Sequence, residues 1–122
     1  MIPVSTRQKG KVGEIIGRRY LELKGYRHVT SNWYCNYGEI DHIFTYNSIL
    51  IFTEVKFVTN VNYCRPEDLF NYRKRAKFQR AIRIFLNKYR SKVFKWRADL
   101  VCITQDEQRF WIQHYCNVLG TG

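Results

Sequence analysis

The stretch that decides the fold is residues 38–58, GEIDHIFTYNSILIFTEVKFV. Two runs rich in β-branched and aromatic residues, 38–46 and 49–58, flank Asn47-Ser48, a pattern that predicts two antiparallel strands joined by a tight turn. Both runs carry apolar side chains on both faces, which is typical of a sheet that is covered on both sides. Alternation assigns one face to Ile40, Phe44, Ile51 and Val55, and the other to Ile43, Leu50 and Phe52.

The register of this hairpin is expected to gather its charged residues on one face. Counting back from the turn, where Tyr46 meets Ile49, pairs Ile43 with Phe52, Asp41 with Glu54, and Glu39 with Lys56. Opposed carboxylates repel each other, and a divalent cation between them removes that repulsion. Carboxylate oxygens suit Mg²⁺ or Mn²⁺, so Asp41 and Glu54 are candidate metal ligands. The alternative is a rim of solvated charge, with Glu39 and Lys56 as a surface ion pair.

The remaining chain predicts two helices and three further strands around the hairpin. We expect helices over 7–24 and 66–89, and strands over 27–34, 98–104 and 109–116. Apolar residues at helical spacing are Val12, Ile16, Tyr20 and Leu23 on the first helix, and Phe78, Ala81, Ile82, Phe85 and Tyr89 on the second. The order predicts one α/β domain over residues 1–122, with a mixed central sheet flanked by helices.

The charge balance favours a polyanionic partner. The chain has 122 residues, with 21 Lys and Arg against 10 Asp and Glu, for a net charge of +11. Nucleic acid fits better than a membrane surface, because the basic residues do not lie opposite one long apolar face. The chain has neither a membrane-spanning apolar run nor a secretory signal, so we expect a cytoplasmic protein without membrane contact.

The four cysteines are Cys35, Cys64, Cys102 and Cys116, with no C-x-x-C pair. Reduced thiols are the simplest interpretation, while two disulfides or a scattered zinc site remain alternatives. Cys102 lies in an apolar run and is expected in the core.

Several side chains outside the hairpin are candidates for the same chemistry. Glu14 on the first helix offers a fifth charged group, or an ordinary ion pair with Arg18 four residues on. His42 alternates away from Asp41 and is left out of the site. Aromatic residues before Gly38 either stack on unpaired bases or pack in the fold; they are Trp33, Tyr34 and Tyr37. Basic residues on the long helix and just after it either contact phosphates or form a solvated face. Those on the helix are Arg73, Lys74, Lys77, Arg80 and Arg83, and those after it are Lys92, Lys95 and Arg97.

These residues carry a family resemblance. Gly38-Glu39-Ile40-Asp41 followed by Glu54-Val55-Lys56 resembles the D…ExK signature of the PD-(D/E)XK nuclease superfamily. From about Lys9 to Asn117 the chain is similar to the YraN-like bacterial family, uncharacterised proteins with a predicted endonuclease fold. Further matches are Lys11-Val12-Gly13-Glu14, Tyr20-Leu21, Lys24-Gly25-Tyr26, a loop asparagine at Asn32, a helix lysine at Lys77, and Arg97-Ala98-Asp99. The family usually has arginine where this chain has Tyr34, Asn36 and Val58.

The resemblance implies a restriction-endonuclease-like α-β-β-β-α-β core and a Mg²⁺- or Mn²⁺-dependent phosphodiesterase. The implied metal ligands are Asp41, Glu54, the Val55 carbonyl and Glu14, with Lys56 acting on the water or the phosphate charge and Glu39 in support. DNA is favoured over RNA as the partner. Charge and helix position make Arg73, Lys74, Arg80 and Arg97 candidate contacts, together with Lys77, which also matches the family lysine. Two other functions stay open: a nucleic-acid-binding module with little turnover, and an adaptor for an acidic protein. The last strand suits either a sheet edge or a homodimer interface.

Overall fold

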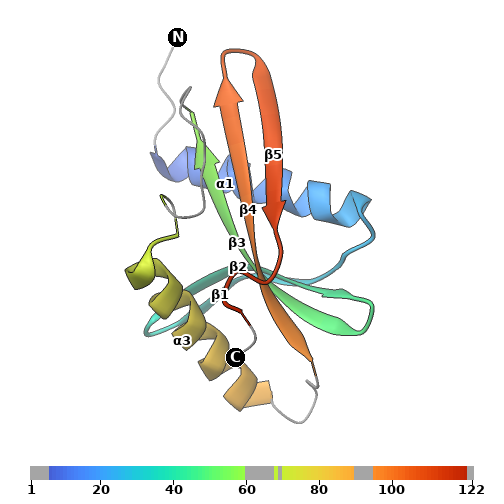
Figure 1. Ribbon diagram of the computed structural model, residues 1–122, viewed down its shortest axis with the longest axis vertical. Coiled ribbons are helices and arrows are strands. Elements are labelled where there is room, and N and C mark those ends of the chain that lie inside the picture. Colours follow the sequence, from blue (N-terminus) through green and yellow to red (C-terminus); the bar gives the residue numbers. More distant parts are fainter. Residues whose placement is uncertain (1–5, 60–67, 69, 90–94, 121–122) are drawn as a thin grey trace.

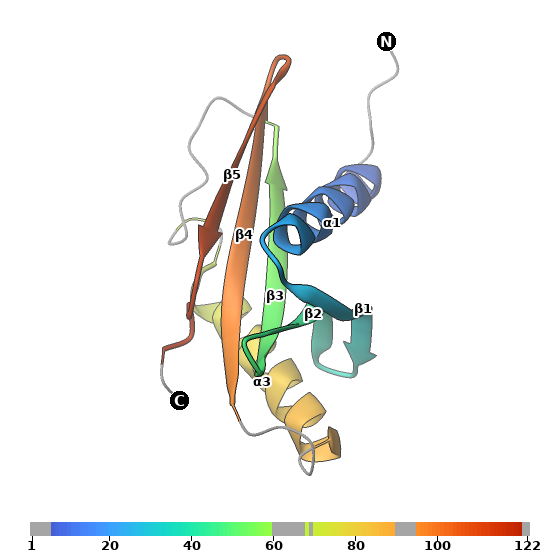
Figure 2. The same cartoon turned by 90° about the vertical axis from the view of Figure 1, so that its right-hand side faces the viewer.

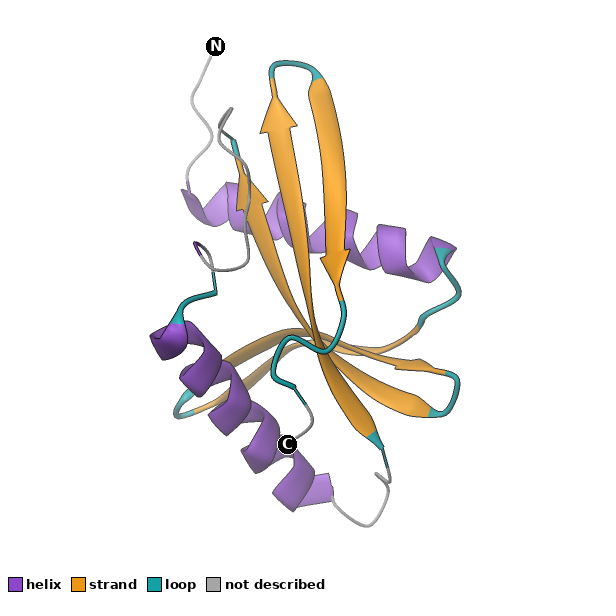
Figure 3. Ribbon diagram, viewed as in Figure 1, coloured by secondary structure: helices purple, strands orange, loops and turns teal. Residues whose placement is uncertain are grey.

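The structure is a computed structural model that describes residues 6–59, 68, 70–89 and 95–120. Its elements in chain order are α1 (Thr6–Leu23), β1 (Arg27–Cys35), β2 (Gly38–Tyr46), β3 (Ile49–Val58), α3 (Tyr72–Tyr89), β4 (Trp96–Asp106) and β5 (Arg109–Tyr115). The strands form one sheet in the order β1-β2-β3-β4-β5, in which β3 and β4 are parallel and the other neighbours are antiparallel. The expected mixed α/β fold is confirmed, with β5 as an added edge strand (Figure 3).

The two described helices cover opposite faces of a strongly twisted sheet. In Figure 1, α1 crosses behind the long strands β3, β4 and β5, whereas α3 lies beside the β1–β2 hairpin. Figure 2 shows this hairpin turned well away from the direction of the long strands. One core cluster gathers on the α3 side around Phe52, Ile82 and Leu100, and a second gathers on the α1 side around Leu21, Phe44 and Val101.

The hairpin register agrees with the sequence prediction over most of its length. Tyr46 pairs with Ile49 and Ile43 pairs with Phe52, as expected. Asn47 and Ser48 both have positive φ, 50° and 65°, the backbone that a two-residue hairpin turn of the primed type requires. The β2–β3 ladder ends at the pair His42–Thr53, so β2 leaves β3 just where the acidic residues begin.

Alternation along β2 is interrupted at this point, and one predicted face is wrong. Ile40 was expected beside Phe44, but it packs in the α3-side cluster with Ile43. On the neighbouring strand, Asn32 stands opposite Asp41, since the pairs on either side of it are Ser31–His42 and Trp33–Ile40. Asn32 has φ 53°, a left-handed conformation that asparagine tolerates better than most residues. The asparagine that family likeness places in a loop therefore lies inside a strand, at the break in alternation.

The buried face of α1 differs from the predicted apolar stripe. Val12 is 44% exposed and Leu23 is 89% exposed, while Gly13, Gly17 and Leu21 face the sheet. A Cβ at Gly13 would stand 2.8 Å from the Phe57 Cβ, and one at Gly17 would stand 3.1 Å from a Val55 methyl group. Glycine thus lets α1 approach β3 closely. Ile16 and Tyr20 of the predicted stripe pack against the core beside Leu21, whereas Val12 and Leu23 face outward.

The apolar stripe of α3 is confirmed from Phe78 to Phe85, but Tyr89 is exposed and the predicted start of the helix is wrong. Phe78, Ala81, Ile82 and Phe85 are buried. The helix begins at Tyr72, because the Asn71 side-chain oxygen accepts the Lys74 N–H at 3.0 Å and caps the first turn. The expected first residue, Pro66, lies outside the described residues. Neither described helix is long and apolar enough to span a membrane.

The described cysteines agree with the interpretation as reduced thiols. Cys35, Cys102 and Cys116 form no disulfide, and Cys102 is buried as expected. Cys64 lies outside the described residues.

Candidate metal centre

Three carboxylates converge where the alternation of β2 breaks. Oxygen atoms of Glu14, Glu39 and Asp41 all lie within 4.8 Å of one another. The Asn32 amide donates to Glu14 Oε1 at 2.8 Å and to Glu39 Oε1 at 2.6 Å, which ties α1 to the β1–β2 hairpin. Hard oxygen donors at such distances suit Mg²⁺ or Mn²⁺. The residues present therefore fit a divalent cation, with Glu39 closer to the centre than the sequence indicated.

Asp41 is anchored by a backbone hydrogen bond to β3. The Val55 N–H donates to Asp41 Oδ2 at 2.8 Å. The register predicted that Asp41 pairs with Glu54 in the β2–β3 ladder, and this prediction is wrong. The ladder ends at His42–Thr53, and Asp41 contacts β3 only through its side chain. Burial, followed by the charges of Glu54, Glu14 and Glu39, raises the pKa of Asp41 to about 8, against the opposing effect of the Val55 N–H. Asp41 is thus a carboxyl group whose charged form needs compensation.

Glu54 and Lys56 share one face of β3, as alternation requires. Lys56 Nζ lies 3.2 Å from Glu54 Oε1, and this ion pair replaces the surface pair between Lys56 and Glu39 that was one alternative. Burial raises the pKa of Glu54, while Lys56 and the nearby Lys74 on α3 act in the opposite direction. The Glu54–Lys56 pair therefore lies on β3 next to Asp41, with Lys74 of α3 close enough to act on Glu54.

His42, which strand alternation left out of the site, contacts the backbone of the helical turn that carries Glu14. His42 Nε2 donates to the backbone oxygen of Glu14 at 2.7 Å, since a carbonyl oxygen can only accept. The other ring nitrogen, Nδ1, then accepts from Ser31 Oγ at 2.8 Å, and Ser31 Oγ accepts from His28 Nε2 at 2.7 Å. Burial lowers the pKa of both histidines, which favours the neutral rings that this chain of hydrogen bonds needs. The break in alternation brings His42 to the turn that carries Glu14, and no spacing in the sequence signals it.

A hollow of about 970 Å³ opens from the centre along α1. Glu14, Asn32 and Glu39 line one part of it, and Lys11, Arg18 and Arg19 line another. The i,i+4 pair that forms on α1 joins Arg18 to Glu22 at 3.5 Å, not Arg18 to Glu14. Of these basic residues only Arg19 was not singled out in the sequence, because its spacing resembles that of any solvated helix face.

The predicted basic face of α3 is exposed to solvent. The helix carries seven basic and no acidic residues, and Arg73, Lys74, Lys77, Arg80 and Arg83 are all exposed. The Arg80 guanidinium lies 5.0 Å above the ring centre of Tyr37.

The aromatic cluster before Gly38 divides between the core and the surface. Trp33 packs edge-to-face on Phe85 inside the core, with ring centres 5.2 Å apart. Tyr34, on the other side of the strand, is 77% exposed. Strand alternation therefore leaves Tyr34, not Trp33, as a surface for an unpaired base.

Arg97 is half-buried and belongs to an internal hydrogen-bond network. Its Nε and Nη2 donate to the fully buried Asp99 at 2.8 and 3.0 Å, and Nη2 also donates to the Tyr26 hydroxyl at 2.8 Å. His114 Nε2 and the Asn117 N–H donate to the same carboxylate at 2.8 and 3.0 Å. The Arg97-Ala98-Asp99 motif thus fastens β4 to β5 and to the C-terminal segment, which commits Arg97 to an internal carboxylate.

The Asp99, His114 and Cys116 side chains also lie within 4.8 Å of one another, but their contacts do not suit a second reactive centre. His114 Nε2 faces both Asp99 Oδ2 at 2.8 Å and Cys116 Sγ at 3.7 Å, so the ring cannot relay a proton from sulfur to carboxylate. Burial raises the pKa of the Cys116 thiol, which disfavours a thiolate. This cluster is a cross-link of the fold.

Asp41→Asn is expected to stabilise the metal-free protein at pH 9 by roughly 1–3 kcal/mol. The amide oxygen of Asn still accepts the Val55 N–H, and its NH₂ group replaces a charge that the neighbouring glutamates repel. The pKa of Asp41 rises on folding from 3.8 to about 8. Stability from its protonated form is therefore fully present below about pH 4 and is lost as the pH rises through 8. Denaturant unfolding in chelator, measured from pH 5 to 9, checks this result.

Glu22→Gln is the matched control, because it removes one exposed carboxylate of α1 that pairs with Arg18 at the surface. This control is expected to leave stability and its pH slope almost unchanged. Addition of Mn²⁺ should reverse the order, with the parent gaining stability and Asp41→Asn gaining little. An Asp41→Asn protein that is less stable than the parent at pH 9 in chelator would show that Asp41 is needed as a charged group by the fold itself.

Together the fold and the site define a small α/β protein with an acidic cluster that can hold a metal ion. Residues 13–103 match the uncharacterised protein family UPF0102. A UPF0102 protein of Carboxydothermus hydrogenoformans is 31% identical over 116 residues, which cover 95% of this chain and 98% of that protein. One of Photobacterium profundum is 32% identical over 123 residues, covering 99% and 97%. The chain belongs to the UPF0102 family, the YraN-like group that its motifs resemble.

Proposed function

We propose that this protein is a divalent-metal-dependent endonuclease that acts on nucleic acid, with DNA favoured over RNA. The observation that carries the proposal is the convergence of Glu14, Glu39 and Asp41, from two elements, to within 4.8 Å beside the Glu54–Lys56 pair. Acidic residues alone do not define a reaction, but a lysine at the rim of such a centre supplies the cation that phosphodiester chemistry needs. The net charge of +11 supports a polyanionic substrate.

Asp41, Glu14 and Glu39 hold a Mg²⁺ or Mn²⁺ ion in this proposal, with Glu54 and the Val55 carbonyl as further ligands. A divalent cation there supplies Lewis acidity to the phosphate and activates water. Lys56 stabilises the negative charge that develops on phosphorus in the transition state, or orients the attacking water. Asn32 fixes the rotamers of Glu14 and Glu39, and His42 holds the helical turn that carries Glu14.

The test of this function is cleavage of a panel of labelled substrates in Mg²⁺, Mn²⁺ and chelator. The panel contains duplexes, junctions, flaps, single strands and structured RNA. Metal-dependent cleavage that disappears in chelator and in an Asp41→Asn protein is the expected result. Cleavage that survives in chelator would contradict the metal mechanism, and absence of cleavage across the whole panel would favour the second function below.

Binding to duplex DNA is expected to be electrostatic, with Lys77 and Arg80 of α3 in contact with phosphates. Replacing both with glutamine should reduce the log–log salt slope of binding by about one to two units, since each phosphate contact contributes about 0.9. Fluorescence anisotropy across a salt series measures this slope. A control protein with Arg27→Gln and Arg109→Gln removes two exposed charges outside α3 and should keep the slope. If both double variants lower it equally, the binding face is not α3.

A second function, a nucleic-acid-binding module with little turnover, is favoured by the contact between Lys56 and Glu54. In that function the ion pair at 3.2 Å persists and neutralises the site. A cytoplasmic location belongs to either function, as reduced thiols are expected in that compartment. A homodimer is also compatible with either function, and the edge strand β5 offers one surface for it.

A further inference from the structure

The hollow along α1 is lined by acidic side chains in one part and basic side chains in another, and the candidate metal centre accounts only for the acidic part. Its acidic end contains Glu14 and Glu39, which contact Asn32. On the helix rim Lys11 and Arg19 are exposed, while Arg18 is paired with Glu22. A chain of phosphates that meets a cation at the acidic end would find these basic side chains next to it. The face of α1 from Lys11 to Glu22 extends over roughly 16 Å, which is longer than one nucleotide needs.

Two apolar side chains border the same hollow without being needed by the core. Ile15 on α1 is 63% exposed and Tyr34 on β1 is 77% exposed, and both line the hollow. The close approach that Gly13 and Gly17 permit turns Ile15 outward, and strand alternation turns Tyr34 outward while Trp33 enters the core. Exposed aromatic and aliphatic surface beside basic groups is the combination on which bases of an unpaired strand stack.

The size of the hollow and the exposed ring of Tyr34 favour an unpaired strand over a duplex. Its volume of about 970 Å³ lies at the upper end of small-ligand pockets, which span roughly 300–1,000 Å³. A space of this size accommodates a few nucleotides of a single strand. Bases within a duplex also present no free face to Tyr34, whereas every unpaired base does.

We propose that the α1–β1 hollow binds a short single-stranded segment of nucleic acid, with bases against Tyr34 and Ile15 and phosphates against Lys11 and Arg19. The inference rests on the proposed function for the role of the neighbouring centre, and it makes the substrate one with an unpaired strand beside the cleavage site. If the substrate also contains a flanking duplex, that duplex binds to the basic face of α3.

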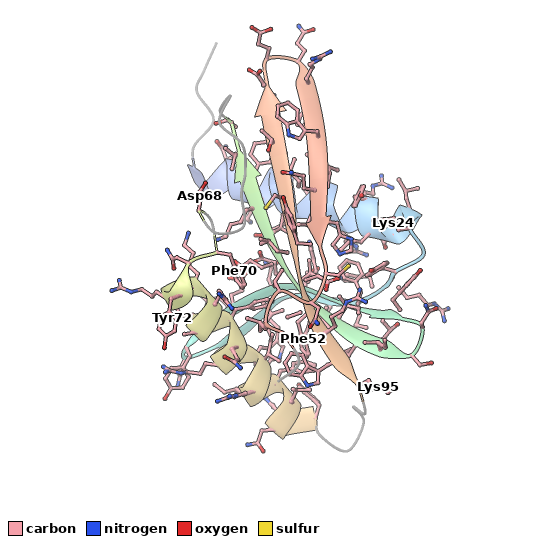
Figure 4. All side chains as sticks on the ribbon, viewed as in Figure 1. Lys24, Phe52, Asp68, Phe70, Tyr72 and Lys95 are labelled. Atoms are coloured by element: carbon pink, nitrogen blue, oxygen red, sulfur yellow. The ribbon has the colours of Figure 1, made fainter. Side chains whose placement is uncertain are left out.

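Binding of fluorescent oligo(dT) and oligo(rU) twelve nucleotides long, measured in chelator, tests this proposal without any cleavage. Tyr34→Ala is expected to weaken binding at least fivefold, because the loss of one stacked base reduces affinity by about five- to a hundredfold. Tyr72→Ala is the matched control: Tyr72 is 86% exposed at the start of α3, projects from the surface in Figure 4, and should change affinity less than twofold. The two oligonucleotides distinguish DNA from RNA as the source of the strand.

The charged rim is tested in the same assay with a single substitution. Arg19→Gln is expected to lower the log–log salt slope by about 0.7, the contribution of one phosphate on a single strand. Arg109→Gln removes the same charge from an exposed position on β5 and should leave the slope unchanged. Circular dichroism and thermal melts of all four variants establish that they fold alike.

Each outcome separates this proposal from the function of the metal centre. If Tyr34→Ala and Arg19→Gln bind as tightly as their controls while the parent still cleaves with Mg²⁺ or Mn²⁺, the hollow is not the strand site and the nuclease stands. If the variants lose affinity as expected but no substrate is cleaved, the strand site stands and the nuclease fails. A parent that binds duplex but not oligo(dT) or oligo(rU) would overturn the strand site.

Discussion

Lys56→Ala is expected to reduce cleavage by at least a hundredfold while nucleic-acid affinity changes by less than about twofold. Lys56 is one of 21 basic residues, so its share of nonspecific binding is small. Its proposed effect is on charge that appears only in the transition state, where removal of a single stabilising group lowers kcat by about 10²- to 10³-fold. Single-turnover cleavage and anisotropy on the same substrate separate these two quantities.

Glu54→Gln is the companion change, because it keeps the size of the side chain and removes its charge. It is expected to weaken metal affinity, and Mn²⁺ in excess should restore part of the lost rate. Lys95→Ala removes an exposed lysine that precedes β4 and serves as the control. Cleavage at the parent rate in both Lys56→Ala and Glu54→Gln would place the activity at another site or in a contaminant.

The largest effect on stability is expected from Asp99→Ala, at about 3–5 kcal/mol. The change leaves the charged Arg97 without its carboxylate and removes the acceptor of the His114 ring and the Asn117 N–H. Such a loss lowers the Tm by roughly 10–20 °C in a domain of this size. Differential scanning calorimetry at pH 7 measures the shift.

The pH dependence of this network has the opposite sign to that of Asp41. Burial alone would raise the pKa of Asp99, but its hydrogen bonds with His114, Arg97 and the Asn117 N–H lower it below the ordinary 3.8. Stability from Asp99 is therefore present above about pH 4 and is lost as the pH falls through its lowered pKa. A double variant, Arg97→Met with Asp99→Leu, should be less damaging than Asp99→Ala because it leaves no buried charge unpaired. Equal losses in the two proteins would mean that the charges do not matter.

Local sequence determines the central hairpin well and the candidate metal centre only in part. Asn47 and Ser48 fix the register because a two-residue turn leaves no freedom, so the pairs back to Ile43–Phe52 could be predicted. The extrapolation to Asp41 and Glu54 failed as a ladder pair, since it assumed regular pleating. The left-handed backbone at Asn32 and the contacts that α1 makes through Glu14 are tertiary features.

The same limit applies to residues that face away from the hairpin. Helical spacing cannot distinguish a face that packs through glycine from one that packs through large side chains. Docking at Gly13 and Gly17 therefore leaves Val12 and Leu23 exposed, although Ile16 and Tyr20 pack against the core as predicted. The environment of Arg97 and Asp99 depends on His114 and Asn117, which reach Asp99 only through the β4–β5 pairing. Such a network cannot be derived from spacing along one strand.

In chain order, the carboxylates of the candidate metal centre all come before β4, the strand that pairs in parallel with β3. Glu14, Glu39, Asp41 and Glu54 all precede Val58, whereas β4 begins at Trp96 and joins β3 in parallel. The β1–β2–β3 meander closes short loops, while the parallel pair must close a long one, so β4 is expected to join after the meander during synthesis. In the emerging chain the acidic groups meet while water still screens them. Burial is then expected to strengthen their repulsion, so a divalent cation that binds at that stage would aid folding.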